Sequence, residues 1–405
     1  MKVLLIDVNC KNSSTGKIVY NLYQRLREDG HQAAICYGRG KRVDGENIFK
    51  FGLDFETYIH AGLSRISGLN GYFSPLSTRR LIRFIETFQP DVVHIHELHA
   101  YFVNIKPLIN YLKSKKIRII WTFHCEYMYT GKCGYAYKCE NWKETCGNCP
   151  KIKRYPKSLF FDFTKKMFRD KKALLSDLDF MIVTPSQWLA DRVKMSFLKD
   201  KKITVIHNGI DADHVFYPRS AEKIESLKEA CGLTNQKIVL SVAPDIMSDR
   251  KGGKTVLEIS KRFVGENIRF VLIGADRDET IEPNVTLIKR TNDQDELAMW
   301  YSAADVFLIC SKQENFPTTC LEAVCCGTPV VGIDAGGTKE TVPAPYGVFC
   351  DPTDLDGLEQ AIRRQILMKQ ETSDISKIGQ TLYNQKTMYL SYLALYESQN
   401  ESLEG

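Results

Sequence analysis

The chain has 405 residues, of which 43% are hydrophobic and 26% charged, a balance that is ordinary for a soluble globular protein. This length allows two domains with complete hydrophobic cores. No apolar run approaches the roughly 20 residues of a membrane-spanning helix, and the N-terminal MKVLLIDVN is too short for a signal peptide, so we expect a cytoplasmic protein.

The net charge of +6 is unevenly distributed along the chain. Residues 1–200 contain 33 Lys and Arg against 19 Asp and Glu, whereas residues 201–405 contain 22 against 30. This asymmetry indicates that the N-terminal half meets an anionic partner, for which a membrane surface or a phosphorylated lipid fits as well as nucleic acid. A solvated basic surface is the alternative that charge alone leaves open.

Short β-branched segments alternate with helical segments from the N-terminus onward. In the first half we expect buried strands at residues 2–8, 32–37, 91–95, 117–123 and 180–184, and a helix at 17–30 that ends at Gly30. The second half repeats this scheme, with strands at 237–243, 268–275, 285–289, 304–311 and 328–334 and helices at 254–263 and 295–304. The alternation predicts an α/β fold with two parallel sheets, each wrapped by helices.

The boundary between the two predicted domains lies near residues 199–208. We expect one domain at 1–200 and a second at 201–381, followed by a C-terminal segment of about 382–405 that contains an aromatic-rich helix at 387–397. Ligands of open parallel sheets bind beyond the carboxyl ends of the strands. The cleft between the domains is therefore the expected active site.

The stretch QENFPTTCLEA at residues 313–323 places Glu314 and Glu322 on either side of a predicted helix start. Pro317 suits the first helical position, and the free N–H groups that follow it suit a phosphate oxygen. A carboxylate can accept hydrogen bonds from two adjacent hydroxyls, so both glutamates suit the reading of a sugar nucleotide. Their separation of roughly 12 Å along a helix favours this interpretation over a glycosidase pair, whose carboxyls lie about 5–9.5 Å apart.

Two cations follow the strand predicted at 237–243. Arg250 and Lys251 precede Gly252 and Gly253 and a predicted helix. Arg can hold phosphate oxygens bidentately, and Lys can act as a point charge. Together with the helix start after Glu314 they predict a diphosphate site, although in isolation such cations face solvent.

These motifs, in this order, resemble glycosyltransferase family 4, the retaining family with the GT-B fold of two Rossmann-like domains. The resemblance covers nearly the whole chain, and it narrows toward transferases of colanic-acid, capsule and exopolysaccharide assembly. The motifs that carry it are SSTGK (13–17), VHIH (93–96), TFH (122–124), PS (185–186), NGID (208–211), RKG (250–252) and ENFPTTCLEAVCCGTPVV (314–331), with the cysteine-rich stretch after residue 124.

The resemblance implies a role for each site residue. His124 and Glu314 would be catalytic, with Glu314 at the 3- and 4-hydroxyls of the transferred sugar and Glu322 on the nucleotide ribose. The remaining donor-binding residues would be Gly16, Arg250, Lys251, Phe316, Thr318 and Thr319. The C-terminal helix would return to the N-terminal domain, as is usual in this fold.

Three positions depart from the family pattern. Gly16 is the only glycine of the first loop, where many relatives have two. Cys125 replaces the Asp that often follows the family histidine. Asp245 occupies the place of a frequent arginine, so Arg250 would substitute for it.

The activity implied is that of a hexosyltransferase that moves a sugar from a nucleotide-diphosphate donor to a polyprenyl-diphosphate-linked oligosaccharide, with retention and with no cofactor for catalysis. We expect it at the inner face of the plasma membrane, serving surface polysaccharide synthesis without a nucleic-acid partner. The alternatives are a 2-epimerase-like enzyme of the same fold and a catalytically weak scaffold that binds sugar nucleotides or membranes.

Four of the thirteen cysteines fall close together in GKCGYAYKCENWKETCGNCP, at Cys133, Cys139, Cys146 and Cys149. In a reducing compartment this spacing suits a closed structural zinc site, and free or redox-active thiols are the alternative. The histidines of HIHELH (94–99) are expected to line the cleft or to satisfy core hydrogen bonds rather than to bind a metal.

The basic stretches 113–118, 151–157 and 165–172 occur beside Phe160, Phe161, Phe163 and Phe168. A basic face that carries aromatic residues is suited to anionic lipid. Residues 58–69 and 72–73 would add apolar contact near the acceptor. Surface lysines over a buried helix face are the alternative.

Overall fold

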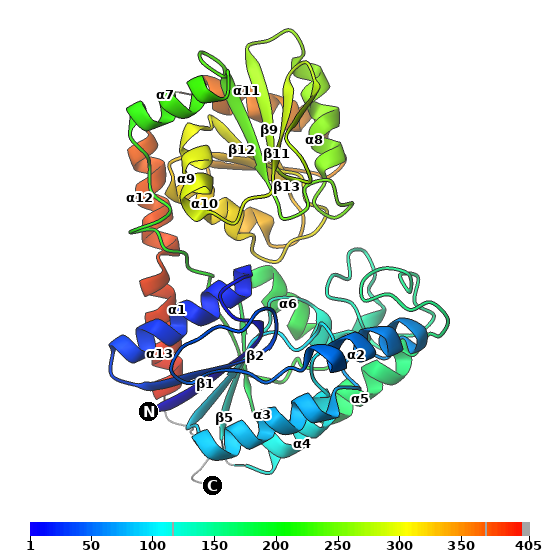
Figure 1. The fold of residues 1–405 in the computed structure, drawn as a ribbon. Coiled ribbons are helices and arrows are strands. Elements are labelled where there is room, and N and C mark those ends of the chain that lie inside the picture. The colour runs from blue at the N-terminus through cyan, green and yellow to red at the C-terminus, as the bar shows by residue number, and fades with distance from the viewer. Residues whose placement is uncertain (116, 369–370, 399–405) are drawn as a thin grey trace. The chain divides into compact units, whose positions relative to one another are not determined.

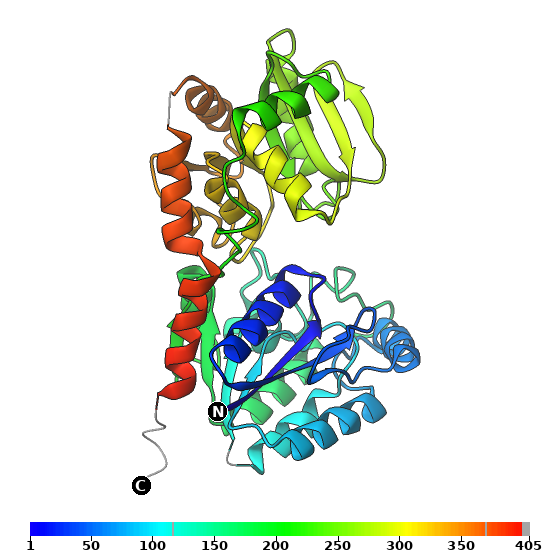
Figure 2. The same ribbon diagram turned by 60° about the vertical axis from the view of Figure 1, so that its left-hand side comes forward.

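The computed structural model describes residues 1–115, 117–368 and 371–398. The chain divides into two compact units, one formed by residues 1–206 with the C-terminal segment from Tyr389, the other by residues 207–388. Figures 1 and 2 show each unit as a sheet between layers of helices. Lys116 of the basic stretch 113–118 and residues 399–405 of the predicted C-terminal segment lie outside the described residues.

The first unit contains a seven-stranded sheet of order β3-β2-β1-β4-β5-β6-β7, in which all neighbouring strands are parallel. Its strands are β1 (Lys2–Asn9), β2 (Gln32–Arg39), β3 (Ile48–Lys50), β4 (Val92–Ile95), β5 (Arg118–Thr122), β6 (Met181–Thr184) and β7 (Ile203–Val205). Its helices are α1 (Ser14–Glu28), α2 (Asp54–Ser67), α3 (Pro75–Phe88), α4 (Ile105–Lys113), α5 (Thr164–Ser176) and α6 (Gln187–Lys194). The central strands are continuous apolar runs because helices cover both faces of the sheet.

The second unit contains a seven-stranded sheet of order β10-β11-β9-β8-β12-β13-β14, parallel except for the antiparallel edge pair β10 and β11. Its strands are β8 (Lys237–Val242), β9 (Ile268–Ala275), β10 (Glu279–Glu282), β11 (Val285–Lys289), β12 (Val306–Ile309), β13 (Val330–Ile333) and β14 (Gly347–Cys350). Its helices are α7 (Ala221–Ala230), α8 (Gly253–Ser260), α9 (Gln294–Ala303), α10 (Thr318–Cys325), α11 (Leu355–Leu367) and α12 (Thr372–Tyr383). The predicted pair of parallel α/β sheets is confirmed.

The strands that the sequence did not predict are β3, β7, β10 and β14. None of them contains a fully buried residue, and all lie at or near a sheet edge. Short edge strands lack the apolar run by which a buried strand is recognised.

The final helix, α13 (Gln385–Glu397), packs on the first unit through its tyrosines. Tyr389 donates a hydrogen bond to Asp29, Tyr392 shares one with Thr122 on β5, and Tyr396 shares one with His94 on β4. The predicted return of this helix to the N-terminal domain is confirmed. Among the described residues, no helix is both long enough and apolar enough to cross a membrane.

Candidate active site

The second unit brings its predicted site residues together where the strand order reverses. β8 pairs with β9 on one side and with β12 on the other, and ligands of open α/β sheets bind at the carboxyl ends of such a strand pair. Arg250 and Lys251 follow β8, and Glu314 follows β12. The two cations and the carboxylate therefore meet although they are more than 60 residues apart.

Glu314 is the centre of a buried charge cluster. Its Oε1 lies 2.8 Å from Nη1 of Arg250 and 2.7 Å from Nζ of Lys251, and the residue is only 6% exposed. Burial raises the pKa of Glu314, but attraction to Lys251 and Arg250 outweighs it, so the pKa lies below the ordinary value. Glu314 is thus ionised at neutral pH and shares its charge with both cations.

Close backbone contacts fix the two loops of this cluster. The N–H of Lys312 donates to the carbonyl of Arg250 at 2.8 Å. Gly252 has φ +74°, and a Cβ atom there would lie 1.9 Å from the carbonyl oxygen of Cys310. Gly336 has φ +80°, and its Cβ would lie 2.0 Å from the carbonyl oxygen of Glu314. Only glycine can come so close to these carbonyl oxygens at a positive φ. The positions of Lys251 and Glu314 therefore depend on Gly252 and Gly336.

The helix after Glu314 is α10, and it begins one residue later than predicted. Pro317 is the N-cap, with ψ 116°, because its extended backbone cannot belong to the first turn. Thr318 and Thr319 are the first helical residues and are half-buried. Glu322 lies one turn further on, where its Oε2 accepts a hydrogen bond of 2.9 Å from the hydroxyl of Tyr301 on α9.

Phe316, which the resemblance places among the donor-binding residues, and Asp245, which stands where an arginine is frequent, lie in contrasting environments. The Phe316 ring is buried and stacks on His207 with centroids 4.7 Å apart, so we assign it a packing role beside the site. Asp245 is exposed, which leaves Arg250 as the residue that meets Glu314 together with Lys251.

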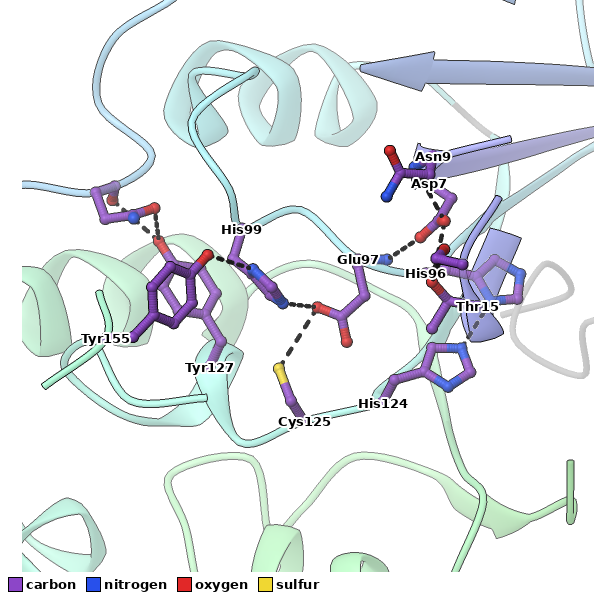
Figure 3. A network of polar contacts seen from close by, with 12 residues as sticks. Asp7, Asn9, Thr15, His96, Glu97, His99, His124, Cys125, Tyr127 and Tyr155 are labelled. Carbon is purple, nitrogen blue, oxygen red and sulfur yellow. Dashed lines mark hydrogen bonds and ion pairs between the residues drawn. The ribbon is translucent and has the colours of Figure 1, made fainter. Parts of the chain in front are cut away.

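The first unit contains a second polar cluster, again where strand order reverses, between β1 and β4 (Figure 3). Asp7 near the end of β1 accepts hydrogen bonds from the backbone N–H of Glu97 at 3.2 Å and from the hydroxyl of Thr15 at 3.2 Å. Burial, followed by repulsion from Glu97, raises the pKa of Asp7 to about 7. An acidic group that titrates near neutrality thus lies at the switch point of this sheet.

Glu97 connects this cluster to Cys125. Its Oε2 lies 2.8 Å from Nε2 of His99 and accepts a hydrogen bond of 3.4 Å from the Cys125 thiol. Burial raises the pKa of Glu97, but attraction to His99 outweighs it, and the net shift is downward. Among the described residues, Glu97, His99 and Cys125 are also the one group of three side chains whose ligand atoms lie within 4.8 Å of one another. The His99–Glu97 ion pair accounts for that proximity.

His124 is half-buried next to this pair and shares a hydrogen bond of 2.9 Å with His96. Burial lowers the pKa of His124 to about 4 and that of His94 to about 3. Both nitrogens of His94 are occupied, by Tyr396 and Thr122, as expected of a core histidine. The rings of His94 and His96 lie 4.0 Å apart. At neutral pH His124 is therefore an uncharged hydrogen-bonding group.

Two further predicted groups occupy defined places in the first unit. Gly16 is buried as the third residue of α1, where its N–H donates to Ser13 Oγ at 3.0 Å. The four cysteines of the 133–149 segment line one pocket.

Three residues of these clusters were not singled out from the sequence, namely Asp7, Tyr155 and Tyr301. Asp7 had a usable signal, because it is the only charged residue within the apolar run VLLIDV. Tyr155, whose hydroxyl lies 3.4 Å from His99 Nδ1, and Tyr301 are tyrosines in ordinary contexts and had none.

Comparison with known proteins gives a consistent result. The family described as Glycosyltransferase Family 4 matches residues 15–214, and that described as Glycosyl transferases group 1 matches residues 223–381. The putative colanic acid biosynthesis glycosyl transferase WcaC of Escherichia coli (strain K12) is 24% identical over 98% of this chain and 100% of its own length.

The chain is also similar to a glucolipid synthase and to a solved structure. Alpha-monoglucosyldiacylglycerol synthase of Acholeplasma laidlawii is 26% identical over 65% of this chain and 63% of its own length. The crystal structure of Anabaena HepE in complex with UDP-glucose superposes with a TM-score of 0.67 at 15% identity, over 98% of this chain and 100% of that one. The two family matches, together with these relatives, show that the chain belongs to the GT-B glycosyltransferases of family 4 and group 1.

Proposed function

We propose that this glycosyltransferase transfers a hexose, with retention, from a nucleoside-diphosphate sugar to a lipid-linked oligosaccharide of a surface polysaccharide. The observation that carries the donor assignment is the meeting of Arg250, Lys251 and Glu314 at the switch point of the second sheet. Anabaena HepE, which shares the fold, is described in complex with UDP-glucose, and WcaC is named for colanic acid biosynthesis.

In this proposal the donor diphosphate replaces Glu314 as the partner of the two cations. Arg250 and Lys251 neutralise the charge that develops on the leaving diphosphate, and the first N–H groups of α10 bind a further phosphate oxygen. Glu314, released from the cations, accepts hydrogen bonds from the sugar hydroxyls. Glu322 accepts from the ribose while Tyr301 holds its second oxygen.

Retaining transfer by this route needs few reacting protein groups. The acceptor hydroxyl attacks the anomeric carbon from the face that the diphosphate leaves. The bond from this carbon to the acceptor oxygen forms as its bond to the phosphate oxygen breaks. The leaving phosphate takes the proton of the hydroxyl. The protein positions the reactants. In this proposal neutral His124 contributes a hydrogen bond near the sugar, and Glu97 is the carboxylate that acts on His124 in place of the Asp that Cys125 replaces.

The proposal of a lipid-linked acceptor is supported by α2, whose polar and apolar faces are reversed. Helices of globular proteins normally turn their apolar face inward. The buried residues of α2 are Glu56, Thr57, His60 and Ser64. Five large apolar side chains of α2 are exposed instead, namely Phe55, Tyr58, Ile59, Leu63 and Ile66, beside the charged residues Asp54 and Arg65.

The polar face of α2 belongs inside because its hydrogen bonds are satisfied there. Glu56 accepts from the backbone N–H groups of Leu76 and Ser77 at 2.9 and 2.7 Å, so it caps the first turn of α3. His60 shares a hydrogen bond of 2.8 Å with Ser74 and receives one of 3.2 Å from the Gly71 N–H. The orientation of α2 is therefore fixed, and its apolar face is left outward.

A second apolar segment adjoins α2. The N–H of Leu159 donates to the carbonyl of Arg65 at 2.7 Å, which places residues 159–163 against the end of the helix. Leu159, Phe160, Phe161 and Phe163 are exposed, whereas Phe168, also predicted for this face, is buried in the core. These four and the five of α2 make up nine of the nineteen exposed large hydrophobic residues that the structure describes. They are concentrated on one part of the first unit.

The charges around this apolar surface favour an anionic membrane as its partner. Residues 151–172 contain nine Lys and Arg and two Asp, and Lys157, Lys165, Lys166 and Arg169 among them are exposed. Apolar side chains at the acyl boundary with cations at the headgroups are the pattern of an interfacial protein. A polyprenyl-linked acceptor would be reached from that position.

Vesicle binding tests this surface. The full chain is expected to cosediment with phosphatidylcholine vesicles only when they contain phosphatidylglycerol. In the double variant Tyr58→Ser, Ile59→Ser each side chain loses about 1 kcal/mol of interfacial burial, so binding should weaken roughly 30-fold. The matched control is Leu367→Ser on α11, which removes an 82% exposed leucine from the other unit and should change nothing. Equal binding of all three proteins would refute the membrane surface.

Donor turnover tests the reaction. A panel of UDP-, GDP- and ADP-sugars, incubated with membrane extract as acceptor source, should give one labelled lipid product whose new linkage has the anomeric configuration of the donor. Isomerisation of the donor without acceptor would instead support the epimerase alternative. Donor binding without turnover would support a scaffold.

A further inference from the structure

The segment between η1 (Tyr127–Tyr129) and α5 gathers four cysteines without regular secondary structure around them. Residues 130–163 contain one short 3-10 turn, η2 (Asn141–Lys143), and no other helix or strand. Loops of this length in compact domains are uncommon unless something orders them. Yet Trp142 is fully buried in the loop and packs edge-on against Tyr129 with ring centroids 5.1 Å apart.

The four cysteines converge despite the irregular backbone. Cys133, Cys139, Cys146 and Cys149 all line a single small pocket with Trp142. The Cys133 and Cys149 thiols lie close enough to influence each other. A backbone N–H group also points at one of the sulfurs, since that of Gly131 donates to Cys146 Sγ at 3.1 Å. Such N–H groups are the outer partners that metal-bound thiolates require.

Among the described residues, the hydrogen-bond acceptors of two buried lysines next to the pocket are backbone carbonyls, and the Asp162 carboxylate attracts Lys132 without bonding to it. Lys132 donates to the carbonyls of Ile152, Arg154 and Pro156 at 2.6–2.9 Å. Lys171 donates to the carbonyls of Tyr127, Thr130 and Gly131 at 2.5–3.4 Å. Both lysines are at most 4% exposed. Buried charge is costly unless an opposite charge lies near it.

From this arrangement we propose that Cys133, Cys139, Cys146 and Cys149 bind one structural zinc ion as a tetrathiolate. Four thiolates around Zn²⁺ carry a net charge of −2, which balances the two buried ammonium groups. Each thiol that binds releases its proton. Closed tetrahedral sulfur sites are typical of structural zinc.

The site closes as the metal enters. In the described residues no three of the four sulfur atoms lie within 4.8 Å of one another, so the loop must contract around the ion. Because Lys132 and Lys171 anchor the loop backbone on both sides, contraction needs only the cysteine-bearing turns to move. The metal then orders the loop that leads to Leu159–Phe163, and it holds no place in the transfer reaction.

Metal analysis of the full chain tests the proposal independently of any activity. Protein purified under reducing conditions should contain about one zinc per chain by plasma mass spectrometry. Cys146→Ser with Cys149→Ser should lower this content at least about tenfold. The matched control, Cys231→Ser with Cys350→Ser, changes two cysteines outside the pocket and should retain the metal.

Cobalt substitution keeps the test decisive if the double variant fails to fold. Chelator-stripped wild-type protein titrated with Co²⁺ should show the visible bands of tetrahedral thiolate coordination, with saturation at one equivalent, and Zn²⁺ should displace them. Protein without zinc that takes up no cobalt, a disulfide between Cys133 and Cys149 in freshly reduced protein, or bound iron in place of zinc would each overturn the proposal. The proposed sugar transfer would survive any of these results.

Discussion

Replacing Glu314 by Gln separates the two roles that we propose for this carboxylate. Without ligand, Glu314 holds Arg250 and Lys251 at 2.8 and 2.7 Å, so it competes with the donor diphosphate for the same cations. Two negative charges roughly 5 Å apart at an effective dielectric of about 20 repel by about 3 kcal/mol. Because the Glu314 side chain can turn away toward the sugar, we expect about half of this repulsion to act against bound UDP. Its removal in Glu314→Gln should therefore tighten UDP binding roughly tenfold.

Turnover should change in the opposite direction. A hydrogen bond between a carboxylate and the sugar hydroxyls contributes about 1.5–3 kcal/mol, so Glu314→Gln should lower kcat about 10- to 100-fold. The assays are calorimetric titration with UDP and steady-state transfer, with Glu258→Gln on α8 as an exposed control of the same unit. If UDP affinity and kcat fall together, Glu314 maintains the fold rather than reading the sugar, and the reasoning is refuted.

Three further predictions follow from the same contacts. Glu322→Ala should weaken the binding of UMP and UDP equally, whereas Lys251→Met should weaken the binding of UDP far more than that of UMP. Titrations in which both variants behave alike would contradict the assignment of Glu322 to the ribose and Lys251 to the diphosphate. Asp7, with a pKa of about 7, keeps its proton in the folded state between pH 4 and 7, where the unfolded chain releases it. As the pH rises through this range, the free energy of unfolding of wild type should therefore fall relative to that of Asp7→Asn, by up to about 1.4 kcal/mol per pH unit. Denaturant titrations at several pH values should show this; a difference between the two proteins that does not change with pH would disprove the shift. Finally, adding Mg²⁺ to zinc-loaded enzyme in metal-free buffer should leave kcat unchanged, because in the proposed mechanism Arg250 and Lys251 neutralise the diphosphate.

Much of the second unit's site could be predicted because its signals are local. Glycines beside cations after a strand, and a glutamate before a helix start, are recognisable in a few residues of sequence. The strand order was not predicted, so nothing indicated that β8 and β12 are neighbours or that Arg250 and Lys251 would be paired with Glu314.

The first unit was less predictable, because its cluster depends on contacts between distant residues. Asp7 meets the N–H of Glu97 across 90 positions of sequence. For α2, periodicity identifies an apolar face but cannot tell whether that face points inward; the bonds of Glu56 and His60 decide this. The cysteine spacing, by contrast, predicted that the four residues lie together, and the two buried lysines beside them appear only in the folded structure.

A crystal structure of the full chain with UDP is the most direct measurement of the donor site. We expect the β-phosphate to contact Arg250 and Lys251, the ribose hydroxyls to contact Glu322, and the Glu314 carboxylate to have left both cations. Nucleotide bound elsewhere, or bound with the Glu314 ion pairs intact, would contradict the account.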